Sequence, residues 1–389
     1  MNSKAIPYGR QTITDADIEA VVTTLRSDFL TQGPAIAEFE KCFAEYTGAK
    51  YAVALSNGTA ALHLCAMALN VKEGTRVITT PITFAASANC VKYCGGSIYF
   101  ADIDPETFLL DIEKVRALLE KHPKGYFSGI IPVDFAGNAV NLEEYRKLAD
   151  EFGCWIIEDA CHAPGGYFTD NTGKQQNCGN GNFADLAIFS FHPVKHIATG
   201  EGGMITTNSK ELYDRLNLYR THGITKDATK FKNSQDEVAQ GGWYYEMQEL
   251  GYNYRLTDFQ AALGTSQLKR ADENLNLRKM LAKRYDEAFK GTSILPAPHA
   301  AGNAYHLYVI RVEDRKGLYE FLRTKNIFAQ VHYVPVHLMP YYKQFGHKKG
   351  DYPNSEAYYE KCLSIPMYHS LTDSDQDFVI KTILAYKKN

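Results

Sequence analysis

The chain has 389 residues, of which 45% are apolar and 22% are charged, a composition typical of a folded globular protein. Its length exceeds what a single hydrophobic core comfortably organises, which favours two domains or one large α/β domain with an appendage. The formal net charge of -3 provides no long-range field that would attract nucleic acid or an anionic membrane. An anionic ligand would therefore need a local binding site.

The N-terminal residues contain no apolar stretch of signal-peptide length, and the chain has no run of about 18 apolar residues. We therefore expect a cytoplasmic protein with no membrane or nucleic-acid partner. The eight cysteines follow no regular framework and several lie in apolar segments, which predicts reduced core thiols. Cys154, Cys161, His162 and Cys178 lack the spacing of a zinc site, so no metal is expected.

Short apolar strands alternate with helix-like segments between residues 12 and 210, the pattern of a mostly parallel sheet covered by helices. Strands are expected at residues 52–55, 76–79, 97–100, 129–133, 155–157 and 186–189, and helices at 59–69, 112–119 and 142–152. Residues 171–182 form a polar patch that predicts a surface turn. The fold class predicted is α/β, with a large parallel sheet.

The second half of the chain has a different pattern. Residues 221–252 lack a steady period and are too long for a simple connection, so this stretch is expected to be functional or disordered. A helix begins near residue 256 and leads into a charged helical segment that ends near residue 290. Strands at 308–312 and 328–332 and a C-terminal helix predict a smaller α+β unit. We place the boundary between a large domain of residues 1–265 and a small domain of residues 266–389.

Residues 56–62, with the sequence SNGTAAL, follow a strand and open a helix. The small side chains and unpaired backbone N–H groups at such a helix start form a natural seat for a phosphate. An ordinary turn with Ser56 or Asn57 as the N-cap explains the same pattern. Because the stretch is not GxGxxG, a dinucleotide-binding fold is not favoured.

Residues 156–162, with the sequence IIEDACH, run from an apolar strand into acidic residues at its carboxyl end. Open α/β sheets bind ligands at this edge, which puts Asp159 in position to touch a cofactor. In pyridoxal phosphate (PLP) enzymes a carboxylate beside the pyridine nitrogen keeps it protonated and makes the ring an electron sink. A helix N-cap aspartate is the alternative.

Residues 189–203, with the sequence FSFHPVKHIATGEGG, place Lys195 between the end of a strand and a glycine-rich turn. A lone lysine is usually a solvated surface residue. A lysine forms a Schiff base only where its surroundings lower its pKa, and here its neighbours are apolar, aromatic or potentially cationic. Phe84 and Asn253 are further candidates, Phe84 because an aromatic ring can stack on a pyridine face.

Taken in order, these segments resemble the sugar aminotransferases of the DegT/DnrJ/EryC1/StrS family, a PLP-dependent group of fold type I, over nearly the whole chain. The matching stretches are 30–34 (LTQGP), 56–62, 158–162, 190–203 and 252–256 (YNYRL). The resemblance implies a large domain with a mostly parallel seven-stranded sheet and a smaller C-terminal α+β domain.

The resemblance also implies roles for individual residues. Lys195 would hold PLP as a Schiff base and act as the catalytic residue, Asp159 would pair with the pyridinium nitrogen, and His162 would approach the ring hydroxyl. Phe84 would stack on the ring. The phosphate would be bound by Gly58, Thr59, Ala60 and Ser190, and by Asn253 of a partner subunit. A homodimer with shared active sites follows.

Within the family the resemblance is strongest to transaminases of pseudaminic acid synthesis, because of residues 80–84 (TPITF), 133–137 (VDFAG) and 330–333 (QVHY). It implies a UDP-linked 4-keto-6-deoxy-N-acetylhexosamine as substrate and L-glutamate as amino donor, with 2-oxoglutarate as the second product. Contacts to the sugar nucleotide would come from Tyr8, Asp28, Phe29, Leu30, Thr31, Gly58, Gln330, Val331, His332 and Tyr333.

Three alternatives to this function are compatible with the same motifs. A transaminase of another 4-keto sugar would share every cofactor motif. A PLP-dependent sugar dehydratase would carry a histidine in place of the lysine. Because His196 follows Lys195 directly, a shift of one residue in the alignment would give this alternative. A non-catalytic sugar-nucleotide binding protein would keep the fold alone. Arg220, Arg255 and Lys226 are candidates for binding the diphosphate.

Overall fold

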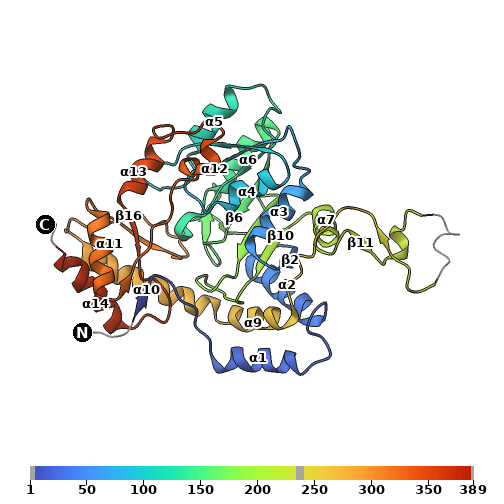
Figure 1. Ribbon diagram of the computed structural model, residues 1–389, viewed down its shortest axis with the longest axis horizontal. Helices are drawn as coiled ribbons and strands as arrows, with labels where there is room; N and C mark the ends of the chain where they lie inside the picture. Colours follow the sequence, from blue (N-terminus) through green and yellow to red (C-terminus); the bar gives the residue numbers. More distant parts are fainter. Residues whose placement is uncertain (1–4, 234–240, 387–389) are drawn as a thin grey trace.

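A seven-stranded sheet forms the centre of the protein, as a computed structural model that describes residues 5–233 and 241–386 shows (Figure 1). The strand order is β2-β10-β9-β6-β5-β3-β4. Six of the strands run parallel, and β10 is antiparallel to both of its neighbours. The strands are β2 Tyr51–Leu55, β3 Arg76–Thr79, β4 Ser97–Phe100, β5 Gly129–Ile131, β6 Trp155–Asp159, β9 Leu186–Ser190 and β10 Gly203–Thr207.

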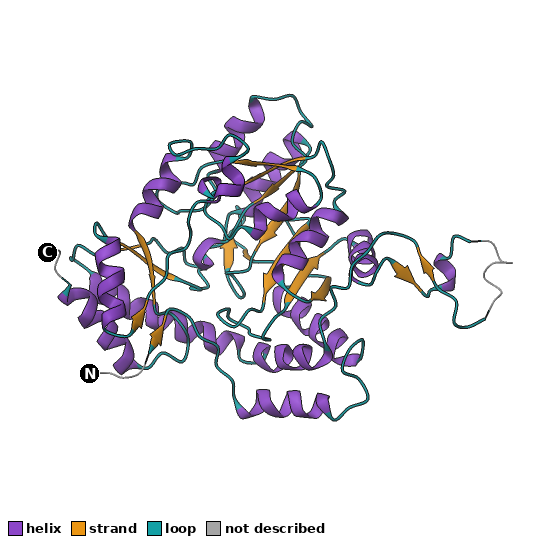
Figure 2. Ribbon diagram, in the orientation of Figure 1, coloured by secondary structure: helices purple, strands orange, loops and turns teal. Residues whose placement is uncertain are grey.

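Helices cover both faces of this sheet (Figure 2). Successive strand residues point to opposite faces, so Ile156 belongs to one buried cluster and Ile157 to the other. The first cluster is completed by α2 Pro34–Thr47, α5 Ile112–Glu120 and α6 Leu142–Phe152, and the second by α3 Gly58–Ala68, α4 Ala86–Tyr93 and α7 Lys210–Arg220. The near-continuous apolar strands of the sequence are explained by burial on both faces.

The prediction of an α/β fold with a mostly parallel sheet is confirmed. All six predicted strands occur, and the helix predicted at residues 142–152 has the bounds of α6. The strand β10 was not among the predicted strands, and a single apolar stretch after a glycine-rich turn would not have shown that it runs antiparallel to its neighbours. The helical segment from residue 256 is two helices, α9 Asp258–Leu268 and α10 Ala271–Phe289, because Arg270 leaves the helical conformation. The helix α1 Asp15–Leu25 packs on α9.

The C-terminal part of the chain packs around a separate apolar cluster. Its three-stranded sheet has the order β13-β14-β16, and β1 near the N-terminus pairs in parallel with β15. These elements are β1 Ile6–Pro7, β13 Leu295–Pro296, β14 Tyr308–Arg311, α11 Arg315–Thr324, β15 Ile327–Phe328, η3 Val336–Leu338, α12 Pro340–Lys343, α13 Pro353–Lys361, β16 Cys362–Ile365 and α14 Asp373–Ala385. The predicted strand at 328–332 is shorter than expected, with only a bridge from Gln330 to Ser364 beyond β15.

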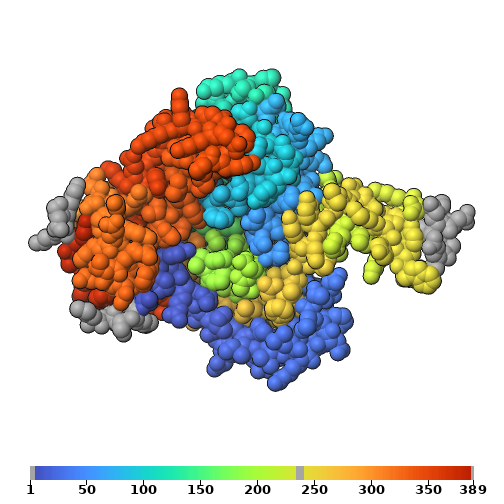
Figure 3. Space-filling view, viewed as in Figure 1, coloured from blue at the N-terminus to red at the C-terminus, as the bar shows by residue number. Residues whose placement is uncertain are grey.

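An arm projects from the body of the molecule at the stretch that lacked a steady period (Figures 1 and 3). It contains η2 Ala228–Lys230 and a two-stranded ribbon of β11 Ile224–Thr225 and β12 Glu246–Met247. The predicted surface turn at 171–182 is only partly right. Within it, β8 Gln175–Asn177 pairs with β7 Tyr167–Thr169. Cys178 is buried in the first apolar cluster, and Gln176 and Asn180 are buried and hydrogen-bond each other. The carbonyl oxygen of Gly179 accepts the Thr206 hydroxyl of β10, which ties this segment to the sheet.

All eight cysteines fall within the described residues and are free. No helix in the described part of the chain is long and apolar enough to cross a membrane.

Candidate active site

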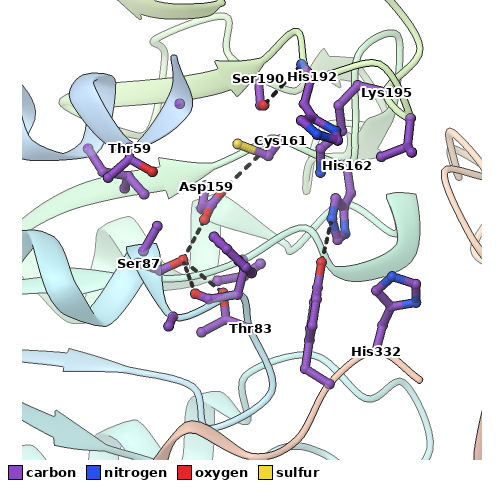
Figure 4. Close-up of a pocket in the computed structure, with 18 of the residues that line it drawn as sticks. Thr59, Thr83, Ser87, Asp159, Cys161, His162, Ser190, His192, Lys195 and His332 are labelled. Atoms are coloured by element: carbon purple, nitrogen blue, oxygen red, sulfur yellow. Dashed lines mark hydrogen bonds between the residues drawn. The ribbon is translucent and has the colours of Figure 1, made fainter. Parts of the chain in front are cut away.

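A cavity of about 530 Å³ lies at the carboxyl ends of the parallel strands, where open α/β sheets bind ligands (Figure 4). Its volume falls within the range of about 300–1,000 Å³ that is usual for small-molecule sites. It is lined by Tyr8, Asn57, Gly58, Thr59, Leu62, Thr83, Phe84, Ala85, Ala86, Ser87, Val133, Asp159, Cys161, His162, Ser190, His192, Val194, Lys195, Glu201, Gln330, Val331, His332, Tyr333, Val334 and Met339.

Lys195 enters the cavity from the loop between β9 and β10. Burial lowers the pKa of its amine, and the nearby Cys161 and Asp159 only partly oppose this effect. The neighbouring His196 is buried elsewhere, where its Nε2 lies 2.7 Å from the carbonyl oxygen of Ala304. Lys195, and not His196, therefore faces the cavity. This disfavours a sugar dehydratase, which would need a histidine at the position of Lys195.

Asp159 is the last residue of β6, and its carboxylate is 5% exposed. One oxygen accepts a hydrogen bond from the Ser87 hydroxyl at 2.6 Å, and the other accepts the backbone N–H of Cys161 at 3.2 Å. The Thr83 hydroxyl lies 2.8 Å from that of Ser87. These contacts fix the orientation of the carboxylate at the wall of the cavity.

The N-terminus of α3 forms one wall of the cavity. The Asn57 side chain caps the helix by accepting the N–H of Ala60 at 2.8 Å. Gly58, the first residue of the helix, lies against Ser190, and a Cβ added at Gly58 would come within 3.1 Å of the Ser190 Cβ. Only glycine leaves the backbone N–H groups open to an anion beside a serine hydroxyl, which is the arrangement expected for a phosphate.

His162 lines the cavity (Figure 4), and two polar neighbours act on its ring. Its Nδ1 accepts the backbone N–H of Ala136 at 3.3 Å, and its Nε2 lies 3.1 Å from the Tyr333 hydroxyl. Burial, with the nearby charge of Lys195, holds the pKa of His162 well below its usual range. The ring is therefore neutral, with its proton on Nε2.

The segment 330–333 closes the cavity from the C-terminal part of the chain. His332 is buried, and its Nδ1 lies 2.9 Å from the Ser364 hydroxyl. Its ring contacts Tyr8 at 5.1 Å between centroids, and the peptide bond from His332 to Tyr333 is cis. Phe84 lies at the rim with 63% of its surface exposed.

Some predicted site residues lie away from this cavity. Ala60 lines a neighbouring cavity with His63, Tyr93 and Tyr254. Asn253 and residues 28–31 are exposed and are absent from the lining of the main cavity. Arg220 is held by Glu40 and by the carbonyl oxygen of Ala54 at 2.9 Å, which leaves it unsuited to bind a diphosphate.

Other residues of the site were not predicted. Ser87 and Thr83 act on Asp159 through hydroxyls, and His192, Glu201 and Met339 line the cavity. The sequence TFAAS at 83–87 shows both hydroxyls, but Thr83 lies in the loop before α4 and Ser87 in its first turn, so no regular spacing pairs them. The remaining residues come from loops that carry no regular spacing either.

The model of the DegT/DnrJ/EryC1/StrS aminotransferase family matches residues 11–384. The chain belongs to this family. Spore coat polysaccharide biosynthesis protein SpsC of Bacillus subtilis is 39% identical over 389 residues, which cover 97% of this chain and 96% of that protein. The UDP-4-amino-4,6-dideoxy-N-acetyl-beta-L-altrosamine transaminase of Campylobacter jejuni is 37% identical over 390 residues, covering 98% and 97%.

Solved structures agree with this assignment. The aminotransferase PseC of Helicobacter pylori, involved in the biosynthesis of pseudoaminic acid, superimposes with a TM-score of 0.86 at 30% identity, covering 98% of each chain. The PLP form of a sugar aminotransferase from Streptococcus pneumoniae gives a TM-score of 0.86 at 30% identity, also over 98% of each chain. The predictions of fold type I, of a sugar aminotransferase and of PLP as its cofactor are confirmed.

The cavity of this aminotransferase fits PLP. It offers a lysine whose pKa is lowered, a buried carboxylate and a helix N-terminus kept open by Gly58. A nucleotide sugar and an amino donor are the substrates that the family implies.

Proposed function

We propose that this aminotransferase moves the amino group of L-glutamate to C4 of a UDP-linked 4-keto-6-deoxy-N-acetylhexosamine, releasing 2-oxoglutarate. The product we propose is UDP-4-amino-4,6-dideoxy-N-acetyl-β-L-altrosamine, a precursor of pseudaminic acid. The relatives in Campylobacter jejuni and Helicobacter pylori support this choice of sugar. The observation that carries the proposal is the half-buried Lys195 opposite Asp159 in one cavity.

The residues of the cavity would divide the work. PLP, when bound, forms a Schiff base with amines and withdraws electrons from the adjacent carbon. Lys195 would hold it covalently until the amino donor displaces the lysine amine, and the freed amine, whose pKa is lowered by burial, would then accept the proton from the donor's α-carbon. Asp159 would keep the pyridine nitrogen protonated, and His162 would approach the ring hydroxyl, with Tyr333 beside its Nε2.

The other contacts would fix the position of cofactor and sugar. Ser190 and the first N–H groups of α3, at Gly58 and Thr59, would bind the phosphate, whereas the N–H of Ala60 already donates to Asn57. Phe84 would cover the ring face from the rim. Tyr8 and residues 330–333 would contact the sugar from the C-terminal side of the cavity.

Absorption spectroscopy tests the chemistry. The purified protein should show a visible band from the lysine-bound cofactor, L-glutamate should bleach it, and Lys195→Ala should lose both the band and turnover. A Lys195→Ala variant that turns over at the wild-type rate would refute the proposed catalytic role.

The sugar is tested separately with a panel of 4-keto sugars made by different UDP-sugar dehydratases. Amination of the L-arabino 4-ketone supports the proposed product. If only D-configured ketones are aminated, the product is wrong, and the enzyme is a transaminase of another 4-keto sugar.

We further propose that the enzyme works as a homodimer with shared sites. Phe29, Leu30 and Asn253 are exposed and lie outside the cavity of their own chain. The arm carries large exposed side chains, with Trp243 75% and Leu250 71% exposed (Figure 3). Exposed apolar groups on a projecting ribbon are typical of a surface that another subunit covers.

Mixing two inactive variants tests the sharing of sites. Lys195→Ala removes the catalytic amine, and Asn253→Asp would repel a phosphate bound by the partner. In a heterodimer one of the two sites regains both intact residues, so an equilibrated mixture should recover about a quarter of the wild-type activity. Sedimentation confirms the dimer independently. No recovery from a dimeric mixture would show that Asn253 serves its own subunit or none.

A further inference from the structure

Two buried carboxyl groups lie directly beneath the active site. Asp134 follows β5 and is 0% exposed, and Glu158 is the neighbour of Asp159 in β6 and is 1% exposed. Because strand residues alternate between faces, Glu158 points away from the cavity that Asp159 lines. The backbone N–H of Asp134 donates to the carbonyl oxygen of Asp159 at 3.1 Å, which connects the two carboxyl groups to the site.

Each of these carboxyl groups has one satisfied oxygen and one unsatisfied oxygen. Asp134 Oδ1 accepts the N–H of Val140 at 2.9 Å, and Glu158 Oε2 accepts the N–H of Gly179 at 2.9 Å. Within the described part of the chain, Asp134 Oδ2 and Glu158 Oε1 receive no N–H or hydroxyl donor, and the Cys178 thiol beside both carboxyl groups is only a weak donor. The two carboxyl groups and the Cys178 sulfur bring ligand atoms within 4.8 Å of one another.

Two full negative charges in this position would be strongly unfavourable, because buried like charges are neither solvated nor screened. One proton between the free oxygens removes the conflict, since Glu158 Oε1–H can then donate to Asp134 Oδ2. Burial raises the pKa of both carboxyl groups. The charge of Asp134 raises the pKa of Glu158 further, and the charge of Asp159 raises that of Asp134. Burial also raises the pKa of the thiols of Cys178 and Cys161, so these remaining titratable neighbours are neutral.

A metal ion is the other occupant that such a cluster suggests. A neutral thiol is a poor ligand, because metal binding requires the thiolate. The free oxygens and the sulfur are also sealed from water, with Cys178 only 2% exposed. A shared proton satisfies the two orphaned oxygens without a further ligand.

We propose that Asp134 and Glu158 share a single proton and act as positioning residues, which fix Asp159 and His162 against the cofactor. The turn that contains Asp134 touches both of them, since its Ala136 N–H donates to His162 Nδ1 at 3.3 Å. Val140 holds one end of that turn through the Asp134 carboxylate. The pair also leaves one negative charge behind Asp159, on the side away from the pyridine nitrogen. The inference rests on the roles proposed above for Asp159 and His162.

Infrared spectroscopy of the full-length protein, with and without cofactor, tests the proton directly. A protonated carboxyl has a C=O band separate from that of carboxylates, and this band should be present near neutral pH and lost in Glu158→Gln. Glu143→Gln is the matched control, because hydrogen bonds from Lys147 and Asn171 lower the pKa of Glu143, which is therefore ionised. Absence of the band in the wild type, or its survival in Glu158→Gln, would overturn the shared proton, as would a stoichiometric metal found by elemental analysis.

The dependence of stability on pH gives a second readout. A carboxyl pKa raised in the folded state means that folding takes up a proton, so this contribution to stability is complete below the unfolded pKa and is lost as pH rises through the folded pKa. The melting temperature of the wild type should therefore fall more steeply with rising pH, above about pH 5, than that of Glu158→Gln. Equal slopes contradict the proposal.

Kinetics test the positioning role. Glu158→Gln keeps a donor for Asp134 and an acceptor for the Gly179 N–H, so its kcat should stay within about threefold of the wild-type value. Glu158→Leu leaves both of these partners unpaired. It should lower kcat by about tenfold or more, with KM for glutamate little changed. A folded Glu158→Leu with wild-type kcat refutes positioning. If the infrared band is present but the cofactor does not bind, the proposed function fails while the proton assignment stands.

Discussion

Replacing Ser87 with alanine removes the hydroxyl that holds Asp159, and its effect can be estimated from the structure. The hydroxyl donates at 2.6 Å to a carboxylate that is 5% exposed, so no water can replace it readily. A hydrogen bond to a charged group contributes about 1.5–3 kcal/mol. Because about 1.4 kcal/mol corresponds to a factor of ten, we expect cofactor affinity or kcat/KM to fall by roughly tenfold to a hundredfold.

Equilibrium titration of the cofactor-free protein with PLP, followed by single-turnover reaction with glutamate, measures the two contributions separately. Cys90→Ala is the matched control, because it truncates a buried residue of the same helix whose thiol donates to the Ser87 carbonyl oxygen rather than to the Asp159 carboxylate. Thr83→Ala removes the hydroxyl that contacts Ser87 and not Asp159 itself, so it should lower cofactor affinity or kcat/KM by less. If Ser87→Ala binds PLP and reacts like the Cys90→Ala control, Asp159 does not depend on this hydrogen bond and the reasoning fails.

Three further predictions concern charge. Arg220→Ala leaves Glu40, whose side chain is 13% exposed, without its cation. Urea denaturation should show a free energy of unfolding lower by about 3–5 kcal/mol, and an unchanged midpoint would contradict this. Burial acts to raise the pKa of Asp17, but hydrogen bonds from Ser266, Thr14 and Arg270 lower it overall, so its contribution to stability is present above about pH 4 and lost as pH falls further. Asp17→Asn should therefore lower the melting temperature at neutral pH and much less near pH 2. Because burial lowers the pKa of Lys195, a larger fraction of its amine is uncharged near neutral pH. An acylating reagent should therefore modify Lys195 in the cofactor-free protein faster than it modifies exposed lysines. Peptide mass spectrometry measures these rates, and equal rates would contradict the prediction.

The sequence was most informative where chemistry follows directly from a strand. Asp159 and Ser190 end parallel strands, and the carboxyl ends of such strands meet at one edge, so their proximity follows from the strand pattern of the sequence. Lys195 follows the second of these strands by a few residues and reaches the same cavity. Local pattern and the general rule for ligand sites in open sheets were sufficient here.

Contacts between distant segments could not be predicted. Tyr333 meets His162 across 171 positions, and no periodicity links the two. The polar patch at 171–182 hid Cys178, which is buried in the first apolar cluster. The direction of β10 depends on which strands it pairs with, which local residue preferences do not encode. The places of Asn253 and residues 28–31 in a site depend on a second subunit, so they stay predictions.

The antiparallel β10 fixes both ends of the loop that carries Lys195, the residue proposed above to be catalytic. Gly203 pairs with Ser190 on one side and with Leu55 on the other, and Phe191 N–H donates to Gly202 O at 2.8 Å, so the loop that carries Lys195 starts and finishes at the same spot. The sheet therefore holds the two ends of this loop side by side. Because both ends are fixed, the loop backbone resists hinge motion. If Lys195 moves a proton as proposed above, we expect its amine to move by rotation about the side-chain bonds rather than by movement of the main chain.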